Sequence, residues 1–106
     1  MKAILKDKPE AGFSLVDMPV PEIGKDQVLI KVEASALCRS DVDVYEWTPL
    51  VQKANYDLPF VMGHEFAGTI VKVGESVRGY EEGDRVAGET HIPCGWCETC
   101  RTGNQH

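Results

Sequence analysis

Three cysteines near the end of the chain are spaced so that their thiols could bind one metal ion. They form the pattern Cys94-x-x-Cys97-x-x-Cys100, with Gly95 in the loop after the first. Thiolates at positions i, i+3 and i+6 supply three corners of a tetrahedron, so a structural zinc site needs one more ligand. The candidate within the chain is its last residue, His106, and the alternative is a ligand beyond it.

Disulfides and an iron–sulfur cluster are the alternative uses of these thiols. Four cysteines could form two disulfides in a secreted domain, but Cys38 is remote in the sequence from the other three. The spacing also opens ferredoxin-type cluster motifs, which continue with a fourth cysteine, often followed by proline. Arg101-Thr102-Gly103 follows instead. The pattern therefore favours zinc.

A second set of metal-ligand types is spread along the chain. Cys38 lies at the end of the alternating strand pattern, and His64 and Glu65 lie near the start of another predicted strand. A thiolate, an imidazole and a carboxylate from two strand ends make a zinc site with an open position, which is the catalytic kind. Zinc held in this way brings a bound alcohol closer to the alkoxide near neutral pH. The alternatives are a buried unreactive Cys38, an incidental His64 and a surface Glu65.

Length and composition are those of one globular domain. The chain has 106 residues, of which 42% are hydrophobic and 26% charged, and these values are not typical of disorder. The net charge of −6 and the lack of a dense Lys/Arg run argue against a nucleic-acid partner. No apolar stretch is long enough to span a membrane or to form a signal core, so we expect no membrane partner and a cytoplasmic location.

The elements that must position these residues are mostly strands. The patterns predict strands at Lys2–Lys6, Val28–Leu37, Phe66–Val73 and Arg85–Ala87. A short helix is predicted from Asp41 to Trp47, with Ser40 as its N-cap, Asp43 in the capping box and Pro49 as its stop. Many short strands with glycine corners suggest a partly closed β-barrel. No glycine fingerprint for dinucleotide binding follows a strand.

Four segments together resemble the zinc-dependent medium-chain alcohol dehydrogenase family. They are Val32–Asp41, Val61–Gly74, Glu82–Val86 and Glu89–His106. The resemblance implies that residues 1–106 are a GroES-like catalytic domain, mainly β, with a short helix and a cysteine-rich zinc lobe. Such a domain is normally followed by a nicotinamide-binding Rossmann domain, so we expect the chain to be truncated before it and to contain no cofactor-binding domain.

The resemblance also assigns the two metal sites. The catalytic zinc would be held by Cys38, His64 and Glu65. The structural zinc would be held by Cys94, Cys97 and Cys100. In the family the first site is completed by a residue well beyond the end of this chain. The fourth cysteine of the second site would also fall just past it.

Four further residues match positions with roles in the family. Ser40 matches the hydroxyl residue that relays the proton of the alcohol. Asp43 stands where many relatives have a histidine that passes this proton to solvent, and an aspartate suits that role near pH 7 only if burial raises its pKa. Arg39 stands where some branches have glycine and others an arginine that contacts the cofactor pyrophosphate. His91 matches a residue beside the substrate that influences specificity.

The resemblance implies an NAD(P)-dependent dehydrogenase that oxidises a secondary alcohol. The threonine branch is the most similar, from Tyr45-Glu46-Trp47 through Pro59 and at His91-Ile92, which implies the 3-hydroxyl of L-threonine as the substrate. Sorbitol and butanediol are the alternatives. Family members are dimers or tetramers through the domain that we expect to be missing. We expect the 106-residue chain by itself to be inactive.

Two functions of other classes remain open. A zinc-binding interaction module would hold one zinc per chain and would not need Cys38. A small electron-transfer protein with an iron–sulfur centre would be brown and contain iron.

Overall fold

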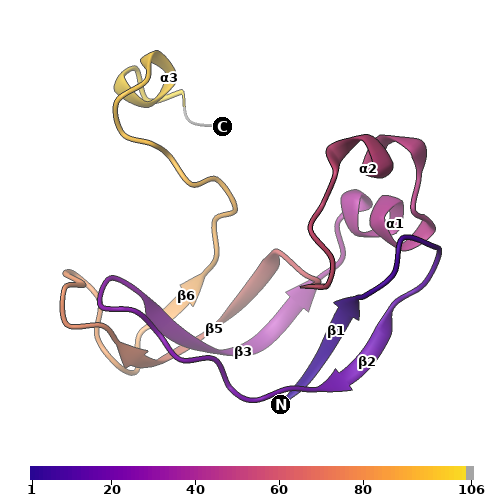
Figure 1. The fold of residues 1–106 in the computed structure, drawn as a ribbon. Coiled ribbons are helices and arrows are strands. Elements are labelled where there is room, and N and C mark those ends of the chain that lie inside the picture. Colours follow the sequence, from indigo (N-terminus) through magenta and orange to yellow (C-terminus); the bar gives the residue numbers. More distant parts are fainter. Residues whose placement is uncertain (105–106) are drawn as a thin grey trace.

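β-strands dominate the computed structural model, which describes residues 1–104 (Figure 1). The strands are β1 (Lys2–Lys6), β2 (Ser14–Asp17), β3 (Val28–Ala36), β4 (Phe60–Val61), β5 (Glu65–Val73) and β6 (Arg85–Ala87). The helices are α1 (Arg39–Glu46), α2 (Pro49–Ala54) and α3 (Glu98–Arg101). The prediction of a mainly β structure with a short helix is confirmed. Within the described residues, no helix is long and apolar enough to cross a membrane.

The strands form two three-stranded sheets, and every pair is antiparallel. One sheet has the order β2-β1-β4 and the other the order β3-β5-β6. The long pair β3–β5 runs from Val28 opposite Val73 to Ala36 opposite Glu65, with two register shifts on the way. In Figure 1 the two sheets form a curved, open surface, with α1 and α2 beyond one part of it and the chain after β6 leading away to α3.

Two strands, β2 and β4, and two helices, α2 and α3, were not expected from the sequence. β2 has four residues and β4 has two, too few for their own alternation to be visible. Both exist because they pair with β1, one on each side. α1 ends before Pro49, as predicted, but Pro49 itself begins α2, which was not expected. The first turn of a helix tolerates proline, because the missing N–H has no partner there in any case.

The predicted start of α1 at Asp41 is wrong, because the helix begins two residues earlier. Its N-cap is Cys38, not Ser40, with an extended backbone at φ −87° and ψ 158°. The Cys38 N–H donates a hydrogen bond to Oδ2 of Asp41 at 2.9 Å. Asp41, rather than Asp43, therefore fills the acidic position of the capping box.

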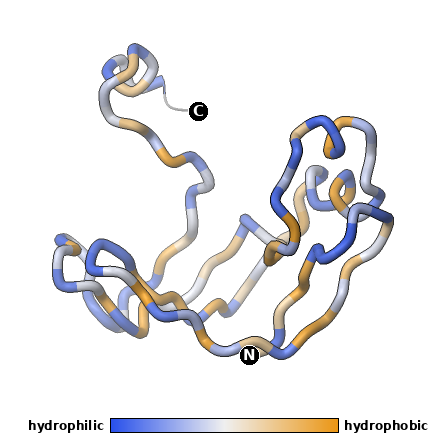
Figure 2. The backbone as a smooth tube through the Cα atoms, viewed as in Figure 1, coloured by the Kyte–Doolittle hydropathy of each residue, from blue (hydrophilic) through white to orange (hydrophobic). Residues whose placement is uncertain are grey.

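The buried core is small. The buried hydrophobic residues of the described part are Ala3, Val44, Val51 and Ile70. Figure 2 shows that apolar stretches nevertheless run along both sheets and into the α3 segment. The radius of gyration is 15.9 Å, whereas a compact domain of this length has about 13 Å. The structure is therefore extended, and much apolar surface remains exposed.

Gly68 lies where β5 comes closest to β3, and we expect Gly68→Ala to destabilise the fold. A Cβ at this position would lie 2.1 Å from the carbonyl oxygen of Lys31. The strands would have to move apart, at a cost of about 1–3 kcal/mol in the free energy of unfolding. Urea denaturation measures this cost. Gly24→Ala is the control, because its Cβ would meet first the flexible side chain of Gln27, at 3.3 Å. Equal losses in the two variants would contradict the expectation.

Candidate metal centres

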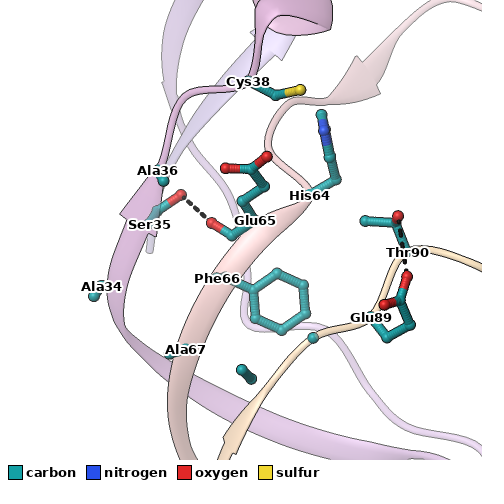
Figure 3. Close-up of a pocket in the computed structure, with 12 residues that line it drawn as sticks. Ala34, Ser35, Ala36, Cys38, His64, Glu65, Phe66, Ala67, Glu89 and Thr90 are labelled. Atoms are coloured by element: carbon teal, nitrogen blue, oxygen red, sulfur yellow. Dashed lines mark hydrogen bonds between the residues drawn. The ribbon is translucent and has the colours of Figure 1, made fainter.

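The pairing of β3 with β5 brings Cys38 and His64 to the same end of one sheet. Ala36 lies opposite Glu65, so the chain leaves β3 toward Cys38 where His64 leads into β5. The Cys38 sulfur, a His64 ring nitrogen and a Glu65 carboxylate oxygen all lie within 4.8 Å of one another. Figure 3 shows these three side chains directed toward a common space. The sequence predicted this set of ligands, and the structure brings the set together; we call it the β-end cluster.

Asp41 connects the two arms of this cluster, and the sequence reasoning missed it. Its carboxylate is 4% exposed, accepts the Cys38 N–H through Oδ2, and has Oδ1 3.4 Å from Nδ1 of His64. A carboxylate beside one ring nitrogen of a histidine fixes the ring and leaves the other nitrogen for a metal. The available signal was the capping-box spacing from Cys38 to Asp41, which overlaps the spacing from Ser40 to Asp43.

Ser40 also contacts the β-end cluster. Its hydroxyl lies 3.4 Å from Nε2 of His64. Hydrogen bonds from the side chain and backbone of Ser40 are the largest causes that lower the pKa of Cys38, and a hydrogen bond from His64 lowers it further. The hydrogen bond with Cys38 raises the pKa of His64. These contacts favour the thiolate at Cys38, which is the form that binds metals.

A pocket of about 620 Å³ opens beside the β-end cluster. Its lining includes Cys38, His64 and Glu65, together with Glu89 and Thr90 from the segment after β6 (Figure 3). This volume lies within the range of about 300–1,000 Å³ for small-molecule sites. The predicted ligands therefore adjoin a space that a small substrate could enter.

The two positions that depart from the family pattern contact each other. Nη2 of Arg39 lies 3.2 Å from Oδ1 of Asp43, one helical turn away. Arg39 is largely exposed and Asp43 is half-buried. A proton relay through Asp43, or a phosphate contact through Arg39, would have to open this pair. Both roles stay predictions.

His91, predicted as a specificity residue, is held by Glu89. Its ring Nδ1 lies 2.6 Å from Oε1 of Glu89, and its backbone N–H donates to the same oxygen at 3.0 Å. Among the described residues, this segment lines the pocket through Glu89 and Thr90. His91 thus lies beside a pocket residue, and its role stays a prediction.

The three cysteines of the lobe have sulfurs close enough to share one metal ion. The Cys100 sulfur lies 3.7 Å from that of Cys94 and 3.4 Å from that of Cys97. Ligands at the corners of a tetrahedral zinc–thiolate site are about 3.8 Å apart, whereas a disulfide measures about 2.05 Å. All four cysteines of the chain are free, so the disulfide alternative is wrong for this structure.

The local backbone of the lobe prepares its thiols for a metal. Gly95 adopts a φ of +83°, which glycine reaches without steric cost and which turns the chain between the first two cysteines. Hydrogen bonds lower the pKa of Cys97 to about 6, the largest from the Thr99 hydroxyl and the next from the backbone N–H of Cys100. The Cys97 N–H donates to the sulfur of Cys94 at 3.4 Å. The other predicted ligand, His106, lies outside the described residues.

The alcohol dehydrogenase GroES-like domain matches residues 24–106 of this chain. L-threonine 3-dehydrogenase of Pectobacterium carotovorum subsp. carotovorum strain PC1 is 47% identical over 106 residues, which are all of this chain and 31% of that protein. The enzyme of the same name from Shewanella frigidimarina strain NCIMB 400 is 48% identical, again over all of this chain and 31% of that protein. The chain thus spans under a third of the curated relatives that it matches.

Solved structures show the same fold. Galactitol-1-phosphate dehydrogenase from Escherichia coli has a TM-score of 0.83 and 31% identity, over 99% of this chain and 29% of that one. The alcohol dehydrogenase TADH from Thermus sp. ATN1 has a TM-score of 0.77 and 30% identity, over the same shares. This chain therefore belongs to the zinc-dependent medium-chain alcohol dehydrogenase family and has its GroES-like fold.

We expect the carboxyl group of Glu89 to titrate far below its ordinary range. Hydrogen bonds from the backbone N–H and then the ring of His91 lower the pKa of Glu89 from 4.5 to about 2. Because the pKa is lower in the folded state, the contact stabilises the fold fully above pH 4.5 and loses this effect as the pH falls toward 2. Carboxyl NMR titration should give a midpoint near 2. His91→Ala should raise the midpoint only partly, since the backbone N–H remains; an unchanged midpoint would contradict the role of the ring.

Proposed function

We propose that residues 1–106 are the N-terminal, zinc-binding catalytic domain of an NAD(P)-dependent dehydrogenase that oxidises the 3-hydroxyl of L-threonine. The observation that carries this proposal is the β-end cluster, whose three ligand atoms lie within 4.8 Å of one another beside a pocket. Identities of 47% and 48% to L-threonine 3-dehydrogenases support the substrate. The activity is proposed for the whole protein, in which a separate domain would bind the cofactor.

The β-end cluster fits zinc by the chemistry of its donors. One thiolate, one imidazole and one carboxylate are the ligand types of catalytic zinc sites, and three protein ligands leave a position open. When bound, zinc lowers the pKa of a coordinated hydroxyl group. Cys38, His64 and Glu65 would hold the ion, and Asp41 would keep the His64 ring in place.

Ser40 is the group of this chain that we propose for proton transfer. Its hydroxyl contacts His64 at 3.4 Å and so lies beside the metal ligands. A hydroxyl can accept one proton while it donates another, which suits a relay out of the pocket. The exit beyond Ser40 is less defined, because the next candidate, Asp43, is paired with Arg39.

The lobe would hold a second, structural zinc. The Cys100 sulfur lies 3.7 Å from that of Cys94 and 3.4 Å from that of Cys97. These three thiolates leave one corner of a tetrahedron for a ligand outside the described residues. Such a site has no open position, so its zinc would stabilise the local fold rather than bind substrate.

A polyol is the alternative substrate. The observation that favours it is the TM-score of 0.83 to galactitol-1-phosphate dehydrogenase, which is higher than several alcohol dehydrogenases reach.

A nicotinamide cofactor is supported by a related structure that is a complex with NADH. That protein is 34% identical to this chain with a TM-score of 0.78, over 97% of this chain and 28% of its own.

We expect the chain to bind two zinc ions, one at each cluster. Cys38→Ser should remove only the first and Cys97→Ser only the second, as counted by native mass spectrometry with elemental analysis. Ser14→Ala is the control, because its hydroxyl donates a hydrogen bond to Asp7, outside both clusters, at 3.0 Å. A wild-type chain that binds one zinc, with no loss in Cys38→Ser, would indicate an interaction module. Iron with a brown colour would indicate an iron–sulfur protein.

The whole protein should reduce NAD⁺ or NADP⁺ when L-threonine is added, and the 106-residue chain should not. We expect Cys38→Ser in the whole protein to lower kcat/KM by at least about a thousandfold, because a catalytic metal ligand is lost. Absorbance of the reduced nicotinamide measures the rate, with sorbitol and butanediol as competing substrates. Turnover of sorbitol but not of threonine would identify the polyol as the substrate in place of L-threonine. Turnover by the 106-residue chain alone would contradict the domain assignment.

A further inference from the structure

Lys6, the last residue of β1, is a buried cation whose hydrogen-bond partners are all neutral. Its exposed fraction is 0%. An ammonium group taken out of water costs free energy unless other polar groups replace the water. Burial lowers the pKa of Lys6, and the charges of Asp7 and Glu10 offset part of this effect. The groups around the Lys6 ammonium must therefore replace the water that it loses on burial.

These partners form a cage for a cation. The ammonium group donates hydrogen bonds to three backbone carbonyl oxygens, those of Glu10, Gly12 and Tyr45. It also lies 5.0 Å from the ring centroid of Trp47 and 5.6 Å from that of Phe13. Carbonyl dipoles and aromatic faces both attract positive charge.

One wall of the cage is the C-terminal end of α1. The carbonyl of Tyr45 belongs to the last turn of this helix, and Trp47 is its C-cap. The end of a helix carries partial negative charge, which a cation stabilises. The last turn of α1 has no basic residue of its own. Lys6 supplies that charge from β1, and the Gly12 N–H adds a hydrogen bond to the same Tyr45 carbonyl at 2.8 Å.

The backbone of Lys6 holds the other arm of the β-end cluster. Lys6 pairs with Phe60, and Leu5 pairs with Val61, in the β1–β4 ladder. The chain continues from β4 to His64 within three residues, and the Met62 N–H is tied to the carbonyl of Ile4 at 2.9 Å. One residue thus contacts both the strand that leads to His64 and the helix that begins at Cys38.

We propose that Lys6 is a positioning residue that fixes α1 against β4 and thereby sets the separation of Cys38 and His64. α1 has eight residues and is about 12 Å long. A helix of this length moves as a rigid rod, so a shift at its C-terminal end is transmitted to Cys38, Ser40 and Asp41 at the other. The zinc consequence of this role rests on the proposed function of the β-end cluster.

Lys6→Met tests the proposal, because it keeps an unbranched apolar chain and removes the cation. We expect zinc affinity at the β-end cluster to fall about tenfold, as measured by competition with a chromophoric chelator, and affinity at the lobe to stay unchanged. Ile70→Val is the matched control, a loss of one buried methylene in the other sheet. If both variants weaken the β-end cluster equally for an equal loss of stability, Lys6 is only structural and the proposal is wrong.

Chemical rescue separates the charge from the packing. Lys6→Ala leaves the carbonyls and the two rings around a cavity that matches n-propylammonium. This cation should restore zinc affinity at the β-end cluster, and the neutral 1-propanol should not. Rescue by both or by neither overturns the proposal. If the Lys6 variants do not fold, Trp47→Leu should weaken the cluster and Trp47→Phe, which keeps an aromatic face, should not; equal effects overturn it.

Spectra of the metal-free chain keep this test independent of zinc. We expect the amide signal of Cys38 and the ring signals of His64 to shift in Lys6→Met and to stay in place in Ile70→Val. Shifts confined to residues around Lys6 would overturn the proposal. A wild-type chain that binds no zinc at the β-end cluster would instead overturn the proposed function alone.

Discussion

The register between β3 and β5 is the constraint on which the rest of the site depends. Val32 pairs with Gly68, but Ala34 pairs with Ala67, so β3 carries one extra residue between them, at Glu33. Without this bulge, pairing continued residue by residue would place Ala36 opposite His64 instead of Glu65. A slip of one residue turns every side chain to the other face of a sheet. The bulge therefore decides which side chains meet at the end of the ladder.

The two candidate metal centres differ in how much of the fold each needs. The lobe places its three thiols within a segment of seven residues, with a glycine turn and one short helix, so little chain entropy opposes its formation. The β-end cluster joins residues from distant parts of the chain. It forms only when β3 and β5 pair in the right register and Cys38 is the N-cap of α1. The lobe is thus a local motif, whereas the β-end cluster depends on the whole fold.

This difference explains what the sequence could predict. Ligand types and spacing identified the candidate metal ligands. The alternating pattern of Val28–Leu37 identified β3, and the β-branched run of Phe66–Val73 identified β5. The sequence did not reveal that Asp41 meets His64 or that Lys6 meets Tyr45, because these partners lie far along the chain. Lys6, for example, meets Tyr45 at a separation of 39 residues. A lysine at a strand end and an aspartate in a helix are ordinary surface residues until the fold covers them. The cap was misassigned because cysteine is an uncommon N-cap.

Lys6 and Asp41 are the buried charged residues of the described part, and they lie at opposite ends of α1. The acid lies in the first turn and the cation meets the last, which is the arrangement that the helix dipole favours. A buried charge adds little net stability but penalises any alternative packing that leaves it without partners. In a structure with so few buried apolar residues, hydrophobic packing alone restricts a short helix weakly. The two charges restrict it through geometry, since each accepts only a placement in which its own partners converge. The position of Cys38 is therefore fixed by polar contacts at both ends of its helix more than by the core.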